Sequence, residues 1–301
     1  MGLDRLMRPL PPATFAERFV AMGTRIECHL FGAPAAAKIA ADLRTAVETV
    51  DDALTVHRIS PTSLLNQLLR AGKEATVDDQ ILWQALLLCD ALHRTTHGLF
   101  DPTMGMGDAR WADLEIDAVN RRVRSPSPTG LDFGGVGKGI ALDACMPVLC
   151  NAGVSSALLS LGESSILAHG EHPLGGAWPL AVPHPAKADT ALVTLGLVQR
   201  CVSISSTLGA ANGDTFSPAD GAAVRTPATT VAVDASGATA EAFSTAMLAG
   251  DAAQRDRLLS SGGCESLRRF DFPRIPRVPT GAAAGGTIHA RLARPLSPPV
   301  S

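Results

Sequence analysis

A loop that contains four glycines and one lysine constrains this 301-residue chain more than any other feature. The glycines are Gly134, Gly135, Gly137 and Gly139. Backbone N–H groups without neighbouring side chains can approach an anion closely. Lys138 adds a cation, Asp132 lies at the entrance, and a helical pattern follows, whose N-terminus attracts negative charge. The loop therefore predicts a site for a nucleotide or another phosphorylated ligand.

The loop does not follow the common phosphate-binding patterns. It lacks the Walker A pattern G-x-x-x-x-G-K-[ST], because Asp132 stands where that pattern has its first glycine, five residues before Gly137. Lys138 is also followed by glycine instead of Ser or Thr. It also lacks the dinucleotide pattern G-x-G-x-x-G, because Ile140 occupies the position of the last glycine. A tight strand-to-helix turn with glycines for close packing remains the alternative interpretation.

Composition narrows the function classes. Hydrophobic residues make up 46% of the chain and charged residues 18%, which is enough for one large domain or two small ones. A net charge of −3 gives no field that favours nucleic acid. We expect no transmembrane segment. Residues 1–12 lack the apolar region of a secretory signal, so we expect a cytoplasmic protein from the sequence as written.

Cysteine and histidine spacing argues against a structural metal centre. The six cysteines are scattered without a C-x-x-C pair, and most have apolar neighbours, which is typical of free buried thiols. The eight histidines show no ligand spacing.

Hydrophobic periodicity predicts an α+β fold with mixed or antiparallel sheets and packed helices, because helical segments are mixed with runs of adjacent strands. Helical spacing covers residues 36–54, 79–96, 139–152 and 238–249. Strand patterns cover residues 14–32, 156–161, 165–169, 178–183, 191–197, 201–205 and 229–234, and 112–124 resembles a hairpin. After residue 266 the composition turns to Pro, Gly, Ala and Arg, so we expect one domain over 1–266 and a disordered tail over 267–301.

Four further segments carry polar groups that suit a ligand site. In the first, Leu99, Phe100 and Asp101 follow a helix in a tight loop, where an aromatic ring and a carboxylate can contact a ligand, although an ordinary turn is the alternative. In the second, Glu241 and Thr245 lie one helical turn apart with Ser244 beside them. One carboxylate and one hydroxyl suit Mg²⁺, although the hydroxyls of such a helix often bond to its own carbonyls. The third and fourth are the hydroxyl-rich segment 203–209 and the strand end 214–221.

Six segments, taken in order, resemble the FAD:protein FMN transferases, the ApbE family. The match runs from about Phe19 to about Gly250. Residues 22–24 resemble the family's Met-Gly-Thr, residues 60–66 its S-x-x-x-x-x-N, residues 98–103 its G-x-F-D-P-T, residues 131–143 its D-L-G-G-I-A-K-G with a downstream Asp, residues 161–162 the start of its second glycine pair, and residues 240–246 its A-D-A-L-S-T-A.

The resemblance implies a bi-lobed, T-fold-like architecture with two closely packed lobes, FAD in a cleft and Mg²⁺ at its pyrophosphate. It implies transfer of FMN from FAD to a Thr or Ser hydroxyl of an acceptor protein, with release of AMP. The FAD site would include Met22, Leu99, Phe100, Asp101, Asp132 and Lys138. The metal would be held by the Gly135 carbonyl, Glu241, Ser244 and Thr245.

The chain departs from the family pattern at several positions. Asp214 occupies the place of the histidine thought to help deprotonate the acceptor hydroxyl, which makes it the candidate catalytic residue. Glu241 replaces an Asp, Glu163 replaces a glycine, and Ser217 replaces another Asp. These changes predict a divergent member. Many members are exported and anchored to a membrane, whereas this chain shows no such leader as written.

Three functions remain open at this point. The first is Mg²⁺-dependent transfer of FMN to an acceptor flavoprotein subunit or domain. The second is FAD binding without catalysis, in a protein that kept the cleft and lost the base. The third is slow hydrolysis of FAD to FMN and AMP, with water in place of the acceptor.

Overall fold

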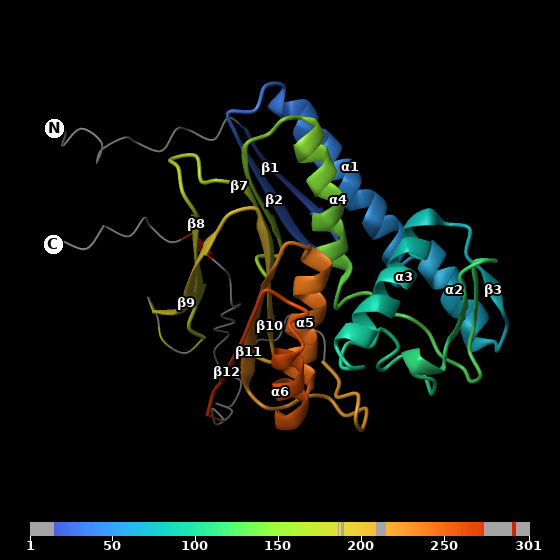
Figure 1. Cartoon of the computed structure of the whole chain (residues 1–301). Helices are drawn as coiled ribbons and strands as arrows, with labels where there is room; N and C mark the ends of the chain where they lie inside the picture. Colours follow the sequence, from blue (N-terminus) through green and yellow to red (C-terminus); the bar gives the residue numbers. More distant parts are fainter. Residues whose placement is uncertain (1–14, 186, 188–189, 209–214, 274–290, 293–301) are drawn as a thin grey trace, which may run out of the picture.

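A seven-stranded antiparallel sheet forms the centre of the structure, a computed structural model that describes residues 15–185, 187, 190–208, 215–273 and 291–292 (Figure 1). The strand order is β1-β2-β6-β7-β10-β11-β12. The strands are β1 (Phe15–Ala21), β2 (Thr24–Phe31), β6 (Ser156–Leu161), β7 (Ser165–Gly170), β10 (Arg200–Ser206), β11 (Ala228–Asp234) and β12 (Ser266–Asp271). All neighbouring pairs are antiparallel. Together with the helices packed on it, the sheet confirms the predicted α+β class.

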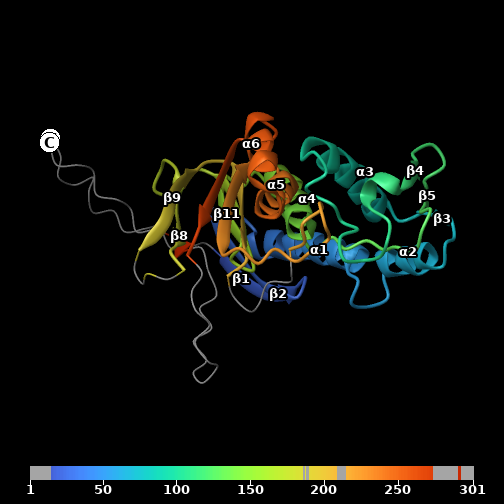
Figure 2. The same cartoon turned by 90° about the horizontal axis from the view of Figure 1, so that it is seen from below.

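Both faces of this sheet are covered, by different layers (Figure 2). Three helices lie along one face: α1 (Ala36–Leu54), α4 (Gly137–Asn151) and α5 (Gly237–Ala249), and α6 (Ala252–Ser260) follows α5. A small sheet of order β13-β8-β9 covers part of the other face and consists of β8 (Trp178–Pro183), β9 (Ala191–Leu197) and β13 (Arg291–Leu292). A separate hydrophobic cluster fills the space between the two sheets, with Trp178 of β8 packed among buried residues such as Ile166 and Val231.

A second lobe projects from the sheet beyond the end of α1 (Figure 1). It contains α2 (Pro61–Arg70), α3 (Gln80–Thr95), a 3₁₀ turn at Trp111–Asp113, and a small sheet made of β3 (Ala75–Thr76), β4 (Glu115–Asp117) and β5 (Arg122–Arg124). The main hydrophobic core runs through both lobes without a break, because Leu65 of α2 and Leu86 of α3 belong to the same buried cluster as Leu43 of α1. No helix in the described ranges has the length and apolar composition needed to cross a bilayer.

The periodicity predicted the long elements closely. The four predicted helices correspond to α1, α3, α4 and α5 with shifts of at most two residues at either end. The segment 14–32 forms the hairpin β1–β2, which turns at Met22 and Gly23. The cysteines of the described part are free, as predicted, and four of the six are buried.

Helix α2 was not predicted, because polar and apolar residues are mixed on both of its faces. Thr62 and Asn66 lie on its buried face, whereas Leu64 and Leu68 are exposed. Its start carries a clear local signal nonetheless: the Ser60 hydroxyl accepts the N–H of Ser63, the Ser63 hydroxyl caps the backbone of Ser60 in return, and Pro61 occupies the first helical position.

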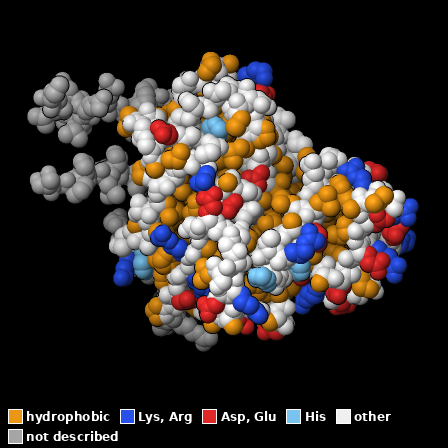
Figure 3. All heavy atoms as spheres, viewed as in Figure 1, with side chains coloured by type: hydrophobic (Ala, Val, Ile, Leu, Met, Phe, Trp, Pro, Cys, Tyr) orange, Lys and Arg blue, Asp and Glu red, His pale blue; other side chains and the backbone are white. Residues whose placement is uncertain are grey.

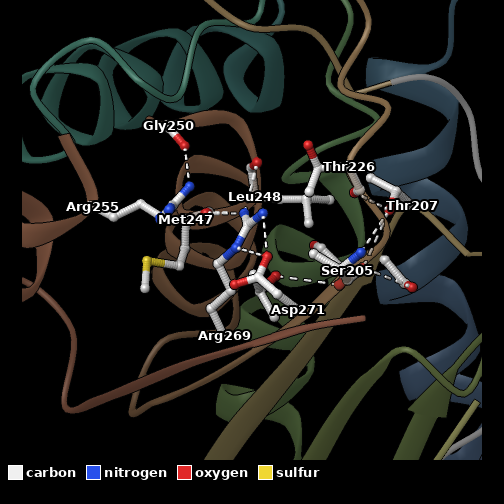
Figure 4. A network of polar contacts seen from close by, with 12 residues as sticks. Ser205, Thr207, Thr226, Met247, Leu248, Gly250, Arg255, Arg269 and Asp271 are labelled. Atoms are coloured by element: carbon white, nitrogen blue, oxygen red, sulfur yellow. Dashed lines mark hydrogen bonds and ion pairs between the residues drawn. The ribbon is translucent and has the colours of Figure 1, made fainter. Parts of the chain in front are cut away.

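The prediction of a disordered tail from residue 267 was wrong at its beginning. Residues 266–271 form β12, which pairs with β11 along its whole length. The tail's residues 274–290 and 293–301 lie outside the described part of the chain. Composition misled here because Arg269 is charged yet its side chain is only 6% exposed. Its guanidinium donates to the carbonyls of Met247 and Leu248 at 2.9 and 3.0 Å, which end α5 (Figure 4).

Arg269 therefore stabilises the C-terminus of α5, where unpaired carbonyls and the negative end of the helix dipole both favour a cation. We expect Arg269→Ala to lower the free energy of unfolding by about 1–3 kcal/mol, since it leaves buried carbonyls without their donors. Denaturant titration followed by circular dichroism measures the change. Arg268→Ala is the matched control: Arg268 is exposed on the same strand and should change stability by about 0.5 kcal/mol or less. Equal losses in both variants would contradict the capping role.

Candidate functional site

The glycine loop enters α4 from the second lobe and is held there by one buried amide. The Asn66 side chain is 2% exposed and pairs with both backbone groups of Leu131. Its Oδ1 accepts the Leu131 N–H at 2.7 Å, and its Nδ2 donates to the Leu131 carbonyl at 2.8 Å. The N–H of the next residue, Asp132, donates to the carbonyl of Pro102 at 2.8 Å. The start of the loop is therefore fixed to α2 and to the loop that follows α3.

Most amides of the loop are already used inside the protein, which corrects the expectation of a bare cradle. The Gly134 N–H donates to Asp132 Oδ1 at 2.8 Å. The N–H groups of Val136 and Gly137 donate to the Phe133 carbonyl at 3.0 and 2.7 Å. Within the glycine-rich segment 134–139, the amides of Gly135 and Lys138 have no partner among the described contacts. An anion at this loop would therefore meet two backbone donors and the Lys138 side chain.

Glu241 of α5 lies directly against the first turn of α4. Its side chain is 3% exposed. Glu241 Oε2 accepts the N–H of Gly139 at 2.9 Å, and Oε1 lies 3.0 Å from Lys138 Nζ. Oε1 also accepts the hydroxyl of Ser165 on β7 at 2.5 Å. The carboxylate is thus placed at the positive end of α4, where one of the otherwise unpaired helix amides and a lysine stabilise its charge.

The two hydroxyls that follow Glu241 point in different directions. Ser244 is fully buried and faces the sheet, where its hydroxyl lies 2.9 Å from that of Ser203 and 2.7 Å from that of Ser205. Thr245 faces the glycine loop: a Cβ built on Gly135 would lie 3.6 Å from Thr245 Oγ1. The structure therefore brings Glu241 and Thr245 to the loop, and places the Ser244 hydroxyl in a separate network of serines.

The residues predicted to contact the flavin support the loop from several sides. Phe100 is 3% exposed, and its ring lies 3.5 Å from a Cβ built on Gly135, so it packs beneath the loop. Leu99 is buried as well. Met22 lies at the β1–β2 turn with φ of 53°, in the left-handed region, and its methyl group lies 3.2 Å from a Cβ built on Gly137.

The Asp101 carboxylate is occupied by the turn that follows it. Its Oδ1 accepts both the N–H and the hydroxyl of Thr103, at 2.8 and 2.6 Å, and its Oδ2 accepts the N–H of Trp111 at 3.3 Å. Asp101 therefore fixes the shape of the loop between α3 and the 3₁₀ turn.

Helices α4 and α5 cross with their backbones in contact. A Cβ on Gly139 would lie 2.3 Å from the carbonyl oxygen of Gly237, a separation that no side chain can adopt. Asp143, one turn further along α4, accepts bonds from the first residues of α5: the Ser236 hydroxyl at 2.8 Å and the N–H groups of Gly237 and Ala238 at 2.6 and 3.1 Å. Burial raises the pKa of the Asp143 carboxyl above its usual value, against the opposing effect of these donors.

The family model of the ApbE family matches residues 22–267. The chain belongs to the ApbE family. Solved structures share the fold. Those of the ApbE protein of Thermotoga maritima, the flavinyl transferase ApbE of Pseudomonas stutzeri in its apo form and the flavin transferase ApbE of Vibrio cholerae each superpose with a TM-score of 0.70, at 17, 19 and 16% identity. They cover 84, 85 and 85% of this chain, which covers 93, 94 and 96% of theirs. Comparison with curated proteins found no match.

The donors at the metal position that the resemblance implies fit Mg²⁺ in part. The described residues contain no group of three or more His, Cys, Asp and Glu side chains that could hold a metal ion. One hydroxyl, Thr245, faces Gly135, and one carboxylate, Glu241, lies against Gly139 and Lys138 in the next turn; Mg²⁺ accepts such a sparse oxygen set when substrate phosphates and water complete it. The Ser244 hydroxyl does not fit, because it is bonded to Ser203 and Ser205 on the side of the sheet.

Asp214, the candidate catalytic residue, lies outside the described residues, so its place at the site stays a prediction. The segment that follows it is described. Phe216 pairs with Ala223 in an isolated antiparallel bridge, and its ring lies 3.1 Å from a Cβ built on Gly105. The chain after Asp214 therefore packs on the loop that follows Phe100.

Two contributors to the site gave little or no sequence signal. Ser165 reaches Glu241 from β7, across 76 positions of the chain, and a lone serine in a strand carries no recognisable spacing. Asn66 belongs to a family motif, but its double bond to the Leu131 backbone is visible only when α2 and the loop are placed together.

Asp143 connects the two helices that carry the site, so we expect Asp143→Asn to destabilise the protein by about 1–3 kcal/mol. The amide nitrogen would face an N–H or hydroxyl donor of α5 and leave at least one of them unpaired. Thermal and urea unfolding measure the loss. Asp42→Asn serves as the control, because Asp42 pairs with Lys38 on the exposed surface of α1 and should leave stability nearly unchanged. A loss no larger than the control's would contradict this role of Asp143.

Proposed function

We propose that this chain is an Mg²⁺-dependent FAD:protein FMN transferase. The observation that carries the proposal is that Glu241 pairs with Lys138 and with the Gly139 N–H at the N-terminus of α4, while Thr245 faces Gly135 of the loop just before it. Family membership supports flavin transfer as the kind of reaction. The names of two structural relatives, a flavinyl transferase and a flavin transferase, support it as well.

The proposed site suits a dinucleotide with a charged centre and an apolar end. The two unpaired loop amides and the ammonium of Lys138 would receive the pyrophosphate of FAD. On the same face, hydrophobic side chains gather between the surface over α4 and the lobe with α2 and α3, where an apolar ring system could lie (Figure 3). Met22 and Phe100 hold the loop in position from the two sides.

The proposed reaction is an in-line displacement at the FMN phosphorus. The acceptor Thr or Ser oxygen forms a bond to that phosphorus, the bond to the bridging oxygen breaks, and AMP leaves with that oxygen. The acceptor proton passes to a base, for which Asp214 is the candidate. The Gly135 carbonyl, Glu241 and Thr245 would hold Mg²⁺, whose charge would neutralise that of the pyrophosphate.

One assay tests the proposal directly. The protein is incubated with FAD, Mg²⁺ and an acceptor-domain protein, and the acceptor is weighed by mass spectrometry for one added FMN. Transfer supports the proposal. Release of FMN and AMP without a labelled acceptor would indicate hydrolysis, and FAD binding without turnover would indicate a flavin-binding protein; each of these outcomes would contradict the transferase.

We expect Thr245→Val to lower the transfer rate by about 10-fold or more, the scale on which loss of one contact around a metal is felt. The substitution keeps the side chain's volume and removes only the hydroxyl that faces Gly135. Initial rates of acceptor labelling at varied Mg²⁺ measure the effect. Thr239→Val is the matched control on the same helix, because Thr239 lies two residues before Glu241 on a different face and should leave the rate unchanged. An undiminished rate in Thr245→Val would place the metal elsewhere.

We expect slow FMN transfer by the unaltered protein, because position 214 carries an aspartate. A free aspartate carboxyl has a pKa of about 4, well below the value of about 6.5 for a free histidine, so aspartate is a weaker base than the histidine of the family pattern. Asp214→His should raise the rate and introduce a pH dependence near that histidine value. Transfer rates measured between about pH 5 and pH 9 on both proteins test this. A fast unaltered protein that the histidine slows would show that another residue is the base.

A further inference from the structure

The charge on Glu241 is already balanced within the protein, before any ligand binds. Both carboxylate oxygens are engaged: Oε2 by the Gly139 N–H, and Oε1 by the Lys138 ammonium and the Ser165 hydroxyl. Lys138 is the one formal positive charge among these donors. A carboxylate that is 3% exposed needs such a partner, because leaving a buried charge unpaired costs several kcal/mol.

Lys138 can reach this carboxylate and the loop from the same place. It lies in the first turn of α4, directly before Gly139, and its side chain is 22% exposed. A lysine side chain is a flexible four-carbon stem with a compact charge, so the ammonium can turn from Glu241 toward an anion in front of the loop without moving the helix. The same carboxylate oxygen cannot hold the ammonium and a divalent cation at full strength, since the two positive charges repel each other.

We propose that Lys138 and a divalent cation compete for Glu241, and that the pyrophosphate of FAD decides the competition by drawing the ammonium away. The proposal rests on the proposed function, because it takes FAD as the anion. In the flavin-free protein Lys138 holds Glu241, and Mg²⁺ binds weakly. When the pyrophosphate pairs with Lys138, the carboxylate becomes available to the metal.

This arrangement couples the two ligands. If FAD raises the affinity for Mg²⁺ by a factor, Mg²⁺ must raise the affinity for FAD by the same factor, and such couplings commonly amount to about 5- to 150-fold. Mg²⁺ and FAD then enter together, and the protein avoids holding a metal without its substrate. The competition needs the longer arm of Glu241, which reaches both Gly139 and Lys138, where the family pattern has Asp.

Calorimetric titration with MgCl₂ in the absence of FAD tests the competition. The unaltered protein should bind Mg²⁺ weakly, and Lys138→Met should bind it at least about 10-fold more tightly, a change within the usual range of such couplings. Lys38→Met is the control, since it removes a surface lysine from its pair with Asp42 and should change nothing. Equal Mg²⁺ affinity in the unaltered protein and Lys138→Met would overturn the proposal.

Titration with FAD at varied Mg²⁺ concentrations tests the coupling between the two ligands. FAD affinity should rise with Mg²⁺ in the unaltered protein and become independent of Mg²⁺ in Glu241→Gln, which cannot hold the metal. Lys138→Met should also bind FAD more weakly. An FAD affinity that ignores Mg²⁺ in the unaltered protein would overturn the coupling.

Folding of the lysine variant is itself informative. If Lys138→Met unfolds without metal, Mg²⁺ should restore its thermal transition, because a ligand that binds only the native state stabilises it. If Mg²⁺ does not restore folding of Lys138→Met, the titration is made with Glu241→Asp instead. The shorter aspartate side chain weakens the contact with Lys138 and should raise the affinity for Mg²⁺ in the absence of FAD. An unchanged affinity would overturn the proposal. Tight Mg²⁺ binding by Lys138→Met together with no FMN transfer by the unaltered protein would support the competition and contradict the transferase, so the two failures are distinguishable.

Discussion

Gly139 of α4 and Gly237 of α5 bring two helix backbones into direct contact, and the rest of the site depends on this crossing. The carbonyl of Gly237 fills the space that a side chain on Gly139 would need. Because the helices lie this close, the Asp143 carboxylate reaches the first amides of α5, and the Glu241 carboxylate reaches the Gly139 amide of α4. Each helix thus supplies an acidic group to the N-terminal end of the other, where the helix dipole favours negative charge.

The sheet and its outer strand hold this helix pair in place. Ser165 of β7 contacts Glu241 from one side, and the serines of β10 bind Ser244 from the next strand. At the other end of α5, Arg269 of β12 satisfies the last carbonyls, and Arg255 of α6 donates to the Gly250 carbonyl at 2.8 Å (Figure 4). The helix that carries Glu241 and Thr245 is therefore fixed at both ends, which suits a site that must hold oxygens in set positions.

The charges at the site neutralise each other in the ligand-free protein, and a bound anion would disturb this balance. Lys138 and Glu241 neutralise each other across the crossing, while two loop amides remain without a partner among the described contacts. A pyrophosphate offers Lys138 a second partner and leaves Glu241 in need of a new cation. Under the proposed competition, a phosphorylated ligand and a metal would bind together, rather than either one first at full strength.

Local sequence determined much of this protein. The apolar periodicity of α1, α3, α4 and α5, the alternation in the strands and the six motif segments were enough for the α+β class and the family, because burial on one face imposes a repeat that the chain must carry. The glycines of the loop likewise predicted that its backbone makes a close contact, with a ligand or with another element. Tertiary structure alone decided what that contact is: Gly139 meets another helix instead of a ligand, and most of the loop amides pair within the protein. It also decided that Arg269 is buried and that Ser165 and Asn66 serve the site. These roles join residues distant in the chain, and hydrogen bonds between such residues leave no periodic trace in the sequence.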